Sequence, residues 1–420
     1  MNRFLGFVLA LGLAACRSAG PISTPSSPAK PAAPAASQIV VLVSFDGWRH
    51  DYLERFKPPT LAALASRGVR AEGLIPQFPS KTFPNHYTLV TGLRLASHGI
   101  VSNNMLDPAL PGRFAMSNRD VIADPRWWGG EPIWNTAERQ GKVAAAMFWP
   151  GSEAPINGRQ PTFWMKFDDK FPHAARVAQA LDWLRLPEGH RPSFVTLYFS
   201  DVDTAGHRFG PDSAEVREAA LLVDRALGEF VAGVESLGLA PLVNYVVVSD
   251  HGMAATAPER MIRLDDFIDV ESVDVIDWSP VLGLSPKDGD VERVYRALKD
   301  KHPSLAVYRR AEIPAVYGLA GYPRVAPVVG IAAEGWGITS SVEMTRWAEP
   351  GRRAPGGNHG YDARLKSMQG LFVAAGPRLR SGEVVRPFES IHVYELMCSI
   401  LGIAPASNDG DQAVTRGFLR

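Results

Sequence analysis

Six residues of two chemical kinds stand out as possible ligands for metal ions. Three are aspartates and three are histidines, and they lie shortly after apolar runs or in short glycine-containing motifs: Asp46, Asp203, His207, Asp250, His251 and His359. Carboxylate oxygens and imidazole nitrogens together suit Zn²⁺ or a similar divalent ion. Six such ligands are too many for one tetrahedral ion. They suit two ions that each take three protein ligands and keep positions open for a substrate and a nucleophile.

This hypothesis depends on the whole set, because each residue alone has a simpler interpretation. An aspartate at the end of a strand is often only a helix cap. The chain has ten histidines, and seven of them lie in surface-like or structural contexts: His50, His86, His98, His173, His190, His302 and His392. The remaining candidates are His207, His251 and His359.

Thr82 is the candidate nucleophile. It lies in the stretch PQFPSKTFPNHYTLVTG at residues 76–92, where Pro84 fits the first turn of a helix that residues 85–90 can continue. We expect Thr82 just before the helix N-terminus, where free N–H groups and the helix dipole favour an anion. A hydroxyl there can attack phosphorus if a metal lowers its pKa. The alternative is that Thr82 is only a helix cap.

A second polar stretch follows at residues 97–104, with the sequence SHGIVSNN. An amide side chain from this stretch could donate a hydrogen bond to a phosphoryl oxygen. The alternative is an ordinary turn, because glycine and asparagine are both common in turns.

These candidates need a scaffold that brings distant segments together. The run Ile39 to Phe45 is apolar and β-branched without polar alternation, which is typical of a strand buried on both faces. Further strands are predicted for residues 142–148, 193–199, 244–249 and 370–375. Helices are predicted between them, for residues 60–67, 132–140, 174–184 and 215–236. The alternation indicates an α/β fold with a central, mostly parallel sheet flanked by helices.

The candidate acids fall at the carboxyl ends of these predicted strands. Asp46 follows the first strand, Asp203 follows the strand at 193–199, and Asp250 follows the strand at 244–249. Open α/β sheets bind ligands beyond the carboxyl ends of their strands. We therefore expect the candidate ligands to meet at one edge of the sheet.

Residues 264–351 show weaker periodicity and many prolines and glycines. Strand-like and helix-like pieces occur there, among them a helix-like piece at 291–301. We expect a small inserted cap subdomain in this region, within a catalytic domain of residues 38–420.

Composition excludes several classes of protein. Lysine plus arginine number 44, as do aspartate plus glutamate, so the chain lacks the basic footprint of a protein that binds nucleic acid through its charge. The two cysteines are too few for a disulfide framework or a cysteine-based zinc site. One of them, Cys398, lies in an apolar run and is predicted to be a buried core thiol.

The N-terminus is predicted to be a targeting segment. Residues 1–15 form a signal peptide, with a short positive region and an apolar run that is too short for a permanent membrane span. Small residues precede Cys16 as in a bacterial lipobox, so we expect lipidation of Cys16, followed by a Pro/Ala-rich linker over residues 16–37. The alternative is a plain signal peptide with an incidental cysteine. Lipidation predicts a body anchored by lipid to the bacterial cell envelope, periplasmic or associated with the outer membrane.

Eight segments in order along the chain resemble one enzyme family. They are VSFDGWRHDYL at 43–53, FPSKTFPNHYTLVTGL at 78–93, SHGIVSNNM at 97–105, FWPGSE at 148–153, DTAGHRFGP at 203–211, VVSDHGM at 247–253, GNHGYD at 357–362 and IHVYELMCSILGI at 391–403. Together they resemble the nucleotide pyrophosphatase/phosphodiesterase family of the alkaline phosphatase superfamily, here as a bacterial member. One departure is Asp201-Val202, where the family often has Glu-Pro.

The resemblance implies an alkaline phosphatase-like fold and two Zn²⁺ ions per chain. One ion would take Asp203, His207 and His359. The other would take Asp46, Asp250 and His251, together with the Thr82 hydroxyl. Asn103 matches the asparagine that steadies a phosphate oxygen with the Thr82 backbone N–H. The aromatic residues of the family's nucleotide-base slot match Phe83, Phe167 and Tyr198. Alternatively, aromatic residues there could bind a lipid or choline head group, or they could be ordinary core residues.

The implied function is hydrolysis of phosphodiester or pyrophosphate bonds in nucleotides or similar small molecules. A nucleoside monophosphate would be released through a phospho-threonine intermediate at Thr82. Two alternatives stay open. A related hydrolase would act on phospholipid head groups, phosphonates or sulfate esters with much the same metal site. A surface lipoprotein that binds a ligand without turnover would share the fold, because fold alone does not decide function.

Overall fold

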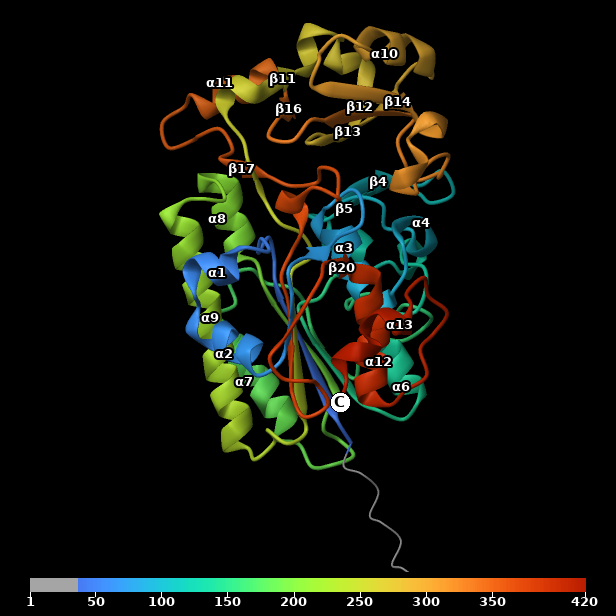
Figure 1. Ribbon diagram of the computed structural model, residues 1–420. Helices are drawn as coiled ribbons and strands as arrows, with labels where there is room; N and C mark the ends of the chain where they lie inside the picture. The colour runs from blue at the N-terminus through green and yellow to red at the C-terminus, as the bar shows by residue number, and fades with distance from the viewer. Residues whose placement is uncertain (1–36) are drawn as a thin grey trace, which may run out of the picture. The chain divides into compact units, whose positions relative to one another are not determined.

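An eight-stranded sheet forms the centre of the computed structural model, which describes residues 37–420 (Figure 1). The strand order is β19-β2-β18-β9-β1-β8-β6-β7. Pairing is parallel from β9 through β1, β8 and β6 to β7, and between β19 and β2, whereas β18 runs antiparallel to β2 and β9. The strands are Glu383–Val385 (β19), Val69–Ala71 (β2), Phe372–Ala375 (β18), Val243–Val248 (β9), Ile39–Phe45 (β1), Phe194–Phe199 (β8), Ala144–Met147 (β6) and Phe163–Met165 (β7). The predicted mostly parallel sheet is confirmed.

Strand β1 shows why an unbroken apolar run predicts a central strand. All seven of its residues are buried. Val40 and Leu42 belong to one hydrophobic core, whereas Val41 and Val43 belong to another. Because successive side chains of a strand point to opposite faces, the sheet has a hydrophobic core on each face.

Helices cover both faces of the sheet, on opposite sides in Figure 1. One face carries α1 (Tyr52–Phe56), α2 (Pro59–Ser66), α7 (His173–Leu184) and α9 (Ala214–Ser236). The other carries α3 (Thr82–Thr91), α6 (Ile133–Arg139) and α12 (Val393–Leu401). The thiol of Cys398 in α12 is buried, and burial raises its pKa. Within the described part of the chain, no helix has the length and apolar character needed to cross a membrane.

A second, smaller sheet lies within residues 264–351. Its antiparallel strands run in the order β12 (Val273–Asp277), β13 (Val281–Pro286), β15 (Val328–Ala332) and β14 (Leu305–Arg309). Helix α10 (Val291–Leu298) packs on it and shares a separate hydrophobic core with it. These elements, here called the cap, lie in the region for which an inserted subdomain was predicted. Figure 1 shows them beyond the ends of the central strands.

Short elements connect these parts. Two-stranded pairings join β3 with β20, β4 with β5, β10 with β17, and β11 with β16. The strands are Leu74–Ile75 (β3), Asn104–Leu106 (β4), Arg113–Ala115 (β5), Ala254–Ala255 (β10), Met261–Arg263 (β11), Gly337–Thr339 (β16), Gly357–Asn358 (β17) and Phe388–Glu389 (β20). The remaining α-helices are Leu95–His98 (α4), Arg119–Ile122 (α5), Asp201–Phe209 (α8), Ser341–Trp347 (α11) and Gln412–Thr415 (α13).

The predictions for the N-terminal segment fall outside this description. The signal peptide at 1–15, lipidation of Cys16 and almost all of the linker at 16–37 precede residue 37, where the described residues begin.

Candidate metal centre and active site

The six candidate metal ligands lie in two groups of three. Asp46 directly follows β1, Asp250 lies just after β9, and Asp203 lies in the first turn of α8, which follows β8. These are the carboxyl ends of three neighbouring strands, so the sheet itself brings the acids together. Two histidines arrive from other segments: His207 lies one helical turn after Asp203, and His359 follows β17.

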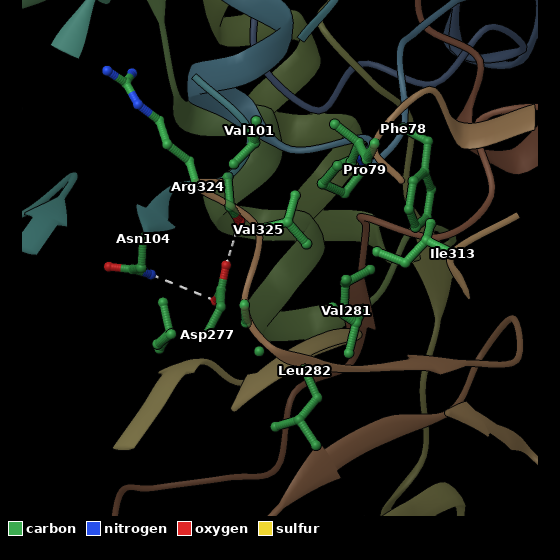
Figure 2. A pocket seen from close by; sticks show the side chains of 16 residues that line it. Phe78, Pro79, Val101, Asn104, Asp277, Val281, Leu282, Ile313, Arg324 and Val325 are labelled. Carbon is green, nitrogen blue, oxygen red and sulfur yellow. Dashed lines mark hydrogen bonds between the residues drawn. The ribbon is translucent and has the colours of Figure 1, made fainter. Parts of the chain in front are cut away.

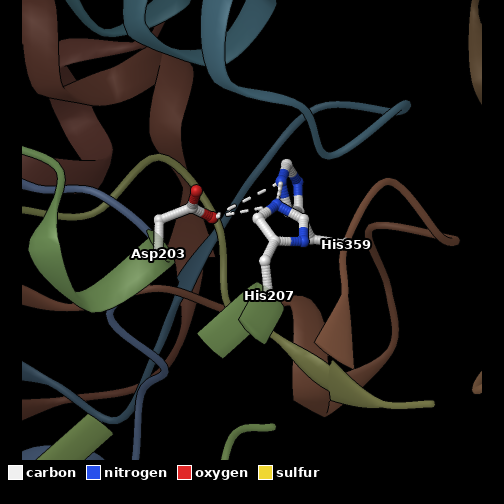
Figure 3. A group of neighbouring side chains, drawn as sticks. All are labelled: Asp203, His207 and His359. Atoms are coloured by element: carbon white, nitrogen blue, oxygen red, sulfur yellow. Dashed lines mark hydrogen bonds and ion pairs between the residues drawn. The ribbon is translucent and has the colours of Figure 1, made fainter. Parts of the chain in front are cut away.

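The first group consists of Asp203, His207 and His359 (Figure 3). The Asp203 Oδ1 atom lies 3.5 Å from Nε2 of each histidine, and the two Nε2 atoms are 3.1 Å apart. Two ligands held at about 2.1 Å from a tetrahedral zinc ion lie about 3.4 Å from each other. The spacing of the three atoms therefore fits one zinc ion.

The second group consists of Asp46, Asp250 and His251, and it is buried. The His251 Nε2 atom lies 3.4 Å from Asp46 Oδ1 and 3.0 Å from Asp250 Oδ2. The Thr82 Oγ1 atom lies 3.4 Å from the same Nε2 atom. The group thus has the spacing of a zinc site, with a hydroxyl placed as a further ligand.

Unpaired carboxylate oxygens support cation binding in both groups. Asp46 Oδ1, Asp203 Oδ1 and Asp250 Oδ2 are buried atoms without a hydrogen-bond partner, and they are the oxygens that face the histidines. Burial, together with Asp250 and Asp203, raises the pKa of Asp46 well above its usual value. Buried acids this close to one another are unfavourable unless a positive charge compensates them. Metal cations would supply that charge, so these residues fit two such ions.

The three histidines are oriented by backbone carbonyl groups. The Nδ1 atom of His207 lies 3.1 Å from the backbone oxygen of Gly357. The Nδ1 atom of His359 lies 2.8 Å from the Ser80 oxygen, and that of His251 lies 2.9 Å from the Gly252 oxygen. Carbonyl oxygens only accept, so each Nδ1–H donates and each Nε2 is left for the centre of its group, which is the usual support for a metal-bound histidine. Burial and the two neighbouring histidines lower the pKa of His359, which favours its neutral, ligand-competent form. In His251 burial is outweighed by the attraction of Asp250, which raises the pKa to about 9, so an ion at this group would displace a proton from Nε2.

Residues around Asp46 fix its position. The Tyr198 hydroxyl donates to Asp46 Oδ2 at 2.6 Å, which leaves Oδ1 for the ion. The next residue, Gly47, has φ of +69°, and a Cβ atom there would lie 2.7 Å from the Asp203 Cα. Only glycine combines that conformation with such a close approach. The Asp46-Gly47 pair therefore lets the two metal groups lie side by side.

Thr82 is the first residue of α3, with Lys81 as the N-cap. The prediction placed it just before the helix, so the helix starts one residue earlier than expected. Pro84 is the third helical residue, a position where its missing N–H has no intrahelical partner to lose. Thr82 is buried, and its Oγ1 atom lies against the second metal group.

His86 supports both Thr82 and the second group, a role that the sequence did not indicate. Its Nδ1 atom lies 2.9 Å from the Thr82 carbonyl oxygen and 3.2 Å from Asp250 Oδ2, and its Nε2 atom lies 2.8 Å from Ser44 Oγ. The spacing of four residues from Thr82 on one helix was the available signal.

Asn103 lies beside the start of α3. Its Oδ1 atom accepts a hydrogen bond from the Phe83 backbone N–H at 2.9 Å. This bond orients the side-chain amide, so that the Nδ2 group is the end that can donate elsewhere. Asn103 and the first backbone N–H groups of α3 thus come together beside Thr82, as an anion site requires.

A largely apolar pocket opens next to Thr82, with about 560 Å³ of free space including its mouth. The three predicted slot residues, Phe83, Phe167 and Tyr198, line it together with Thr82. The prediction did not include the other lining residues, which are Met116, Arg119, Ile122, Phe148, Trp149, Pro150, Gly151 and Glu153. A space of this size, with aromatic walls and a few polar groups, suits a planar organic ligand.

Arg119 and Glu153 supply the charged groups of this pocket. They form an ion pair, and the Arg119 guanidinium lies 5.4 Å from the centre of the Phe167 ring. The Phe167 backbone N–H donates to Glu153 Oε1 at 3.1 Å. Glu153 belongs to the FWPGSE segment, so that motif could have identified it, whereas Arg119 lies in no segment singled out from the sequence.

The sequence matches the family model described as type I phosphodiesterase / nucleotide pyrophosphatase over residues 40–362. That range contains both metal groups and Thr82. The chain belongs to this family.

Relatives within the family match along most of this chain. Human ectonucleotide pyrophosphatase/phosphodiesterase family member 5 is 35% identical over 373 residues, which are 89% of this chain and 76% of the relative. A venom phosphodiesterase of the snake Crotalus durissus collilineatus is 37% identical over 417 residues, which are 96% of this chain and 48% of the relative. The chain thus spans about half the length of the venom phosphodiesterases that it matches.

Solved structures of the family share the fold. Murine ectonucleotide pyrophosphatase/phosphodiesterase 5, as an inactive threonine-to-alanine variant in complex with AMP, superimposes with a TM-score of 0.85 at 35% identity. The match covers 91% of this chain and 100% of that chain. The predicted family and its alkaline phosphatase-like fold are confirmed. The relatives described here come from animals, and the bacterial origin stays a prediction.

Proposed function

We propose that this chain is a two-zinc hydrolase that cleaves phosphodiester or pyrophosphate bonds of nucleotides or nucleotide-like molecules. It releases a nucleoside monophosphate through a phospho-threonine intermediate. The observation that carries the proposal is the position of Thr82, which lines the aromatic pocket and also places its hydroxyl against the second metal group. A ligand in that pocket can therefore present a phosphoryl group to the threonine.

The residues of the site divide the reaction between them. The Thr82 oxygen attacks phosphorus in line, the bond to the leaving oxygen breaks, and the phosphoryl group becomes bound to Thr82. The Asn103 amide and the Thr82 backbone N–H donate to a non-bridging oxygen and stabilise its charge. A water molecule then attacks phosphorus from the vacated side, the bond between phosphorus and the Thr82 oxygen breaks, and the nucleoside monophosphate leaves as the threonine hydroxyl is restored. When bound, two zinc ions would lower the pKa of the Thr82 hydroxyl and of that water and offset charge on the phosphoryl group.

The pocket determines which esters are accepted. A nucleobase can stack on Phe83 and Phe167, and such stacking contributes about 1–3 kcal/mol per base in single-strand binders. The relative that was solved with AMP supports a nucleotide ligand, and its inactivity after the loss of one threonine supports a threonine nucleophile.

We also propose that the body is held at the bacterial cell envelope by a lipid on Cys16. The sequence pattern around Cys16 and the proline-rich stretch that follows it support this location.

The test is an assay of the full chain purified without chelator. Turnover of p-nitrophenyl thymidine-5′-monophosphate is compared with turnover of p-nitrophenyl phosphate, and bound zinc is measured on the same sample. We expect two zinc ions per chain and a strong preference for the diester. Zinc without turnover of the nucleotide ester would redirect the substrate to head groups, phosphonates or sulfate esters. Absence of both zinc and turnover would favour a ligand-binding lipoprotein.

A further inference from the structure

One carboxylate of the cap, that of Asp277, reaches into the catalytic body. Asp277 is the last residue of β12, and the pairing of β12 with β13 shifts its register between Val275 and Asp277. Bulges of this kind re-aim a side chain and are frequent next to active sites. Here the Asp277 side chain leaves the cap and contacts the body.

Three donors of the body converge on this carboxylate. The Lys81 Nζ group lies 2.6 Å from Asp277 Oδ2, and the Ser102 hydroxyl donates to the same oxygen at 2.5 Å. The Asn104 side-chain amide lies 3.5 Å from Oδ1, a contact that Figure 2 shows as a dashed line. The donors come from two separate segments of the chain, so Asp277 joins these segments to each other as well as to the cap.

The positions of the donors in the chain are the decisive feature. Lys81 is bonded to Thr82, and Ser102 and Asn104 lie on either side of Asn103. Each donor is therefore the immediate neighbour of a residue that is proposed to act on the phosphoryl group.

This contact is largely shielded from solvent. The exposed fraction is 5% for the Lys81 side chain and 13% for Asp277. Asp277 also lines a pocket between cap and body whose walls are mostly apolar, as Figure 2 shows for Val101, Val281 and Leu282. A buried ion pair contributes little net stability, and its best-attested use is to fix one arrangement among several.

We infer that Asp277 is a positioning residue, which holds Thr82 and Asn103 at the separation that phosphoryl transfer requires. This inference rests on the proposed function. Among the described residues, the Asn103 side-chain amide makes one hydrogen bond, which its oxygen accepts from the Phe83 N–H. A shift of its segment relative to α3 would move the Nδ2 donor away from the phosphoryl oxygen, and a misplacement of 1 Å can cost about 100-fold in rate.

The chain offers a matched control in a second ion pair between cap and body. The Arg324 guanidinium lies 2.6 Å from Asp107, whose side chain is also 13% exposed. Arg324 donates in addition to the backbone oxygen of Gly99 at 2.9 Å. No hydrogen bond among the described residues joins this pair to Thr82 or Asn103.

Asp277→Asn and Asp107→Asn are compared with the wild-type full chain on p-nitrophenyl thymidine-5′-monophosphate. We expect Asp277→Asn to lower kcat by about 30-fold with KM within about threefold, and to retain its zinc. The contacts of Arg113 with the β12 backbone persist in this variant and keep the cap attached. Asp107→Asn is expected to stay within about threefold of wild type in both constants. If Asp277→Asn fails to fold, Ser102→Ala removes one donor and is expected to lower kcat by about fourfold.

A double-variant comparison separates positioning from loosening of the whole cap. If Asp277 acts by aligning Asn103, it has nothing left to align in the Asn103→Ala variant. The double variant Asp277→Asn/Asn103→Ala should then have a kcat at most about threefold below that of Asn103→Ala alone. Full additivity of the two changes would overturn the inference, as would an equal loss in Asp107→Asn. Turnover by wild type and Asp107→Asn reports on the proposed function separately. If neither the wild type nor Asp107→Asn turned over the nucleotide ester, the proposed function would be wrong, and the inference about Asp277 would be wrong with it.

Discussion

The two metal groups differ in their access to solvent. In the group formed by Asp46, Asp250 and His251, the side chains are at most 2% exposed. In the other group, the exposed fraction is 40% for His207 and 17% for Asp203. The buried group lies against the Thr82 hydroxyl, whereas the exposed group lies on α8 and the segment after β17.

This difference matches two different requirements of the proposed reaction. A nucleophile needs fixed geometry and a site from which water is excluded, because electrostatic stabilisation is strongest there. A leaving group and an attacking water need a path to solvent. The buried group is therefore suited to hold the nucleophile, and the exposed group is suited to the exchange of product and water.

The largest expected effect is at Thr82, the residue that links the buried group to the pocket. Thr82→Ala removes the oxygen that is proposed to attack phosphorus, so kcat/KM for the nucleotide ester should fall by at least about 1,000-fold. Thr82→Ser keeps a hydroxyl and should lose no more than about tenfold. Zinc content is the control, because three protein ligands remain in each group. Turnover at the wild-type level in Thr82→Ala would exclude a phospho-threonine.

Replacing one histidine in each group should destabilise the protein to different extents. His251→Asn removes the imidazole that faces two buried carboxylates and weakens the site for the cation that would compensate them. The free energy of unfolding should therefore fall by about 3–5 kcal/mol, as measured by denaturant unfolding, because buried charge is left uncompensated. His207→Asn changes a side chain that is 40% exposed, so it should lose about 1 kcal/mol or less of stability. Both variants should hold about one zinc ion fewer and turn over at least about 100-fold more slowly. Equal destabilisation of the two would contradict the contrast in burial.

The two groups could be predicted from the sequence because their acids follow strands. An apolar run such as Ile39–Phe45 predicts a strand buried on both faces, and the carboxyl ends of neighbouring parallel strands meet. Other contacts join residues that are far apart in the chain. Tyr198 and Asp46 are separated by 152 positions, and Lys81 and Asp277 by 196 positions. Such contacts depend on tertiary packing that local patterns do not encode. The start of α3 was misplaced by one residue for a related reason, because helix ends depend on caps that several residues can supply.

A smaller effect is expected at the aromatic wall of the pocket. Phe167→Ala removes one stacking surface and should raise KM for the nucleotide ester by about tenfold, with kcat unchanged, because the base binds equally in ground and transition states. Phe167→Tyr keeps the ring and serves as the control. An unchanged KM in Phe167→Ala would mean that the pocket does not bind the base. p-Nitrophenyl phosphate has no base, so neither Phe167→Ala nor Phe167→Tyr should change its rate of hydrolysis appreciably.

The last contrast is between a core histidine and the candidate metal histidines, and it concerns stability instead of turnover. In His98 the Nδ1 atom accepts from the Ile100 N–H at 3.1 Å and the Nε2 atom lies 3.0 Å from Thr88 Oγ1, so the neutral ring is already satisfied. Burial lowers the pKa of His98 from 6.5 to about 3. Between these values the unfolded chain binds a proton that the folded chain does not, so stability falls as pH falls.

For each pH unit below 6.5, the free energy of unfolding of the wild type should therefore fall by about 1.4 kcal/mol relative to that of His98→Gln, in which position 98 cannot titrate. Denaturant unfolding at pH 7 and pH 5 measures the difference in unfolding free energy between the two proteins. That difference should shift by about 2 kcal/mol in favour of the variant at pH 5. Any loss of bound metal in acid would affect both proteins alike and would cancel in the comparison. A difference that stays constant between the two pH values would mean that His98 takes up its proton as readily in the folded protein as in the unfolded chain.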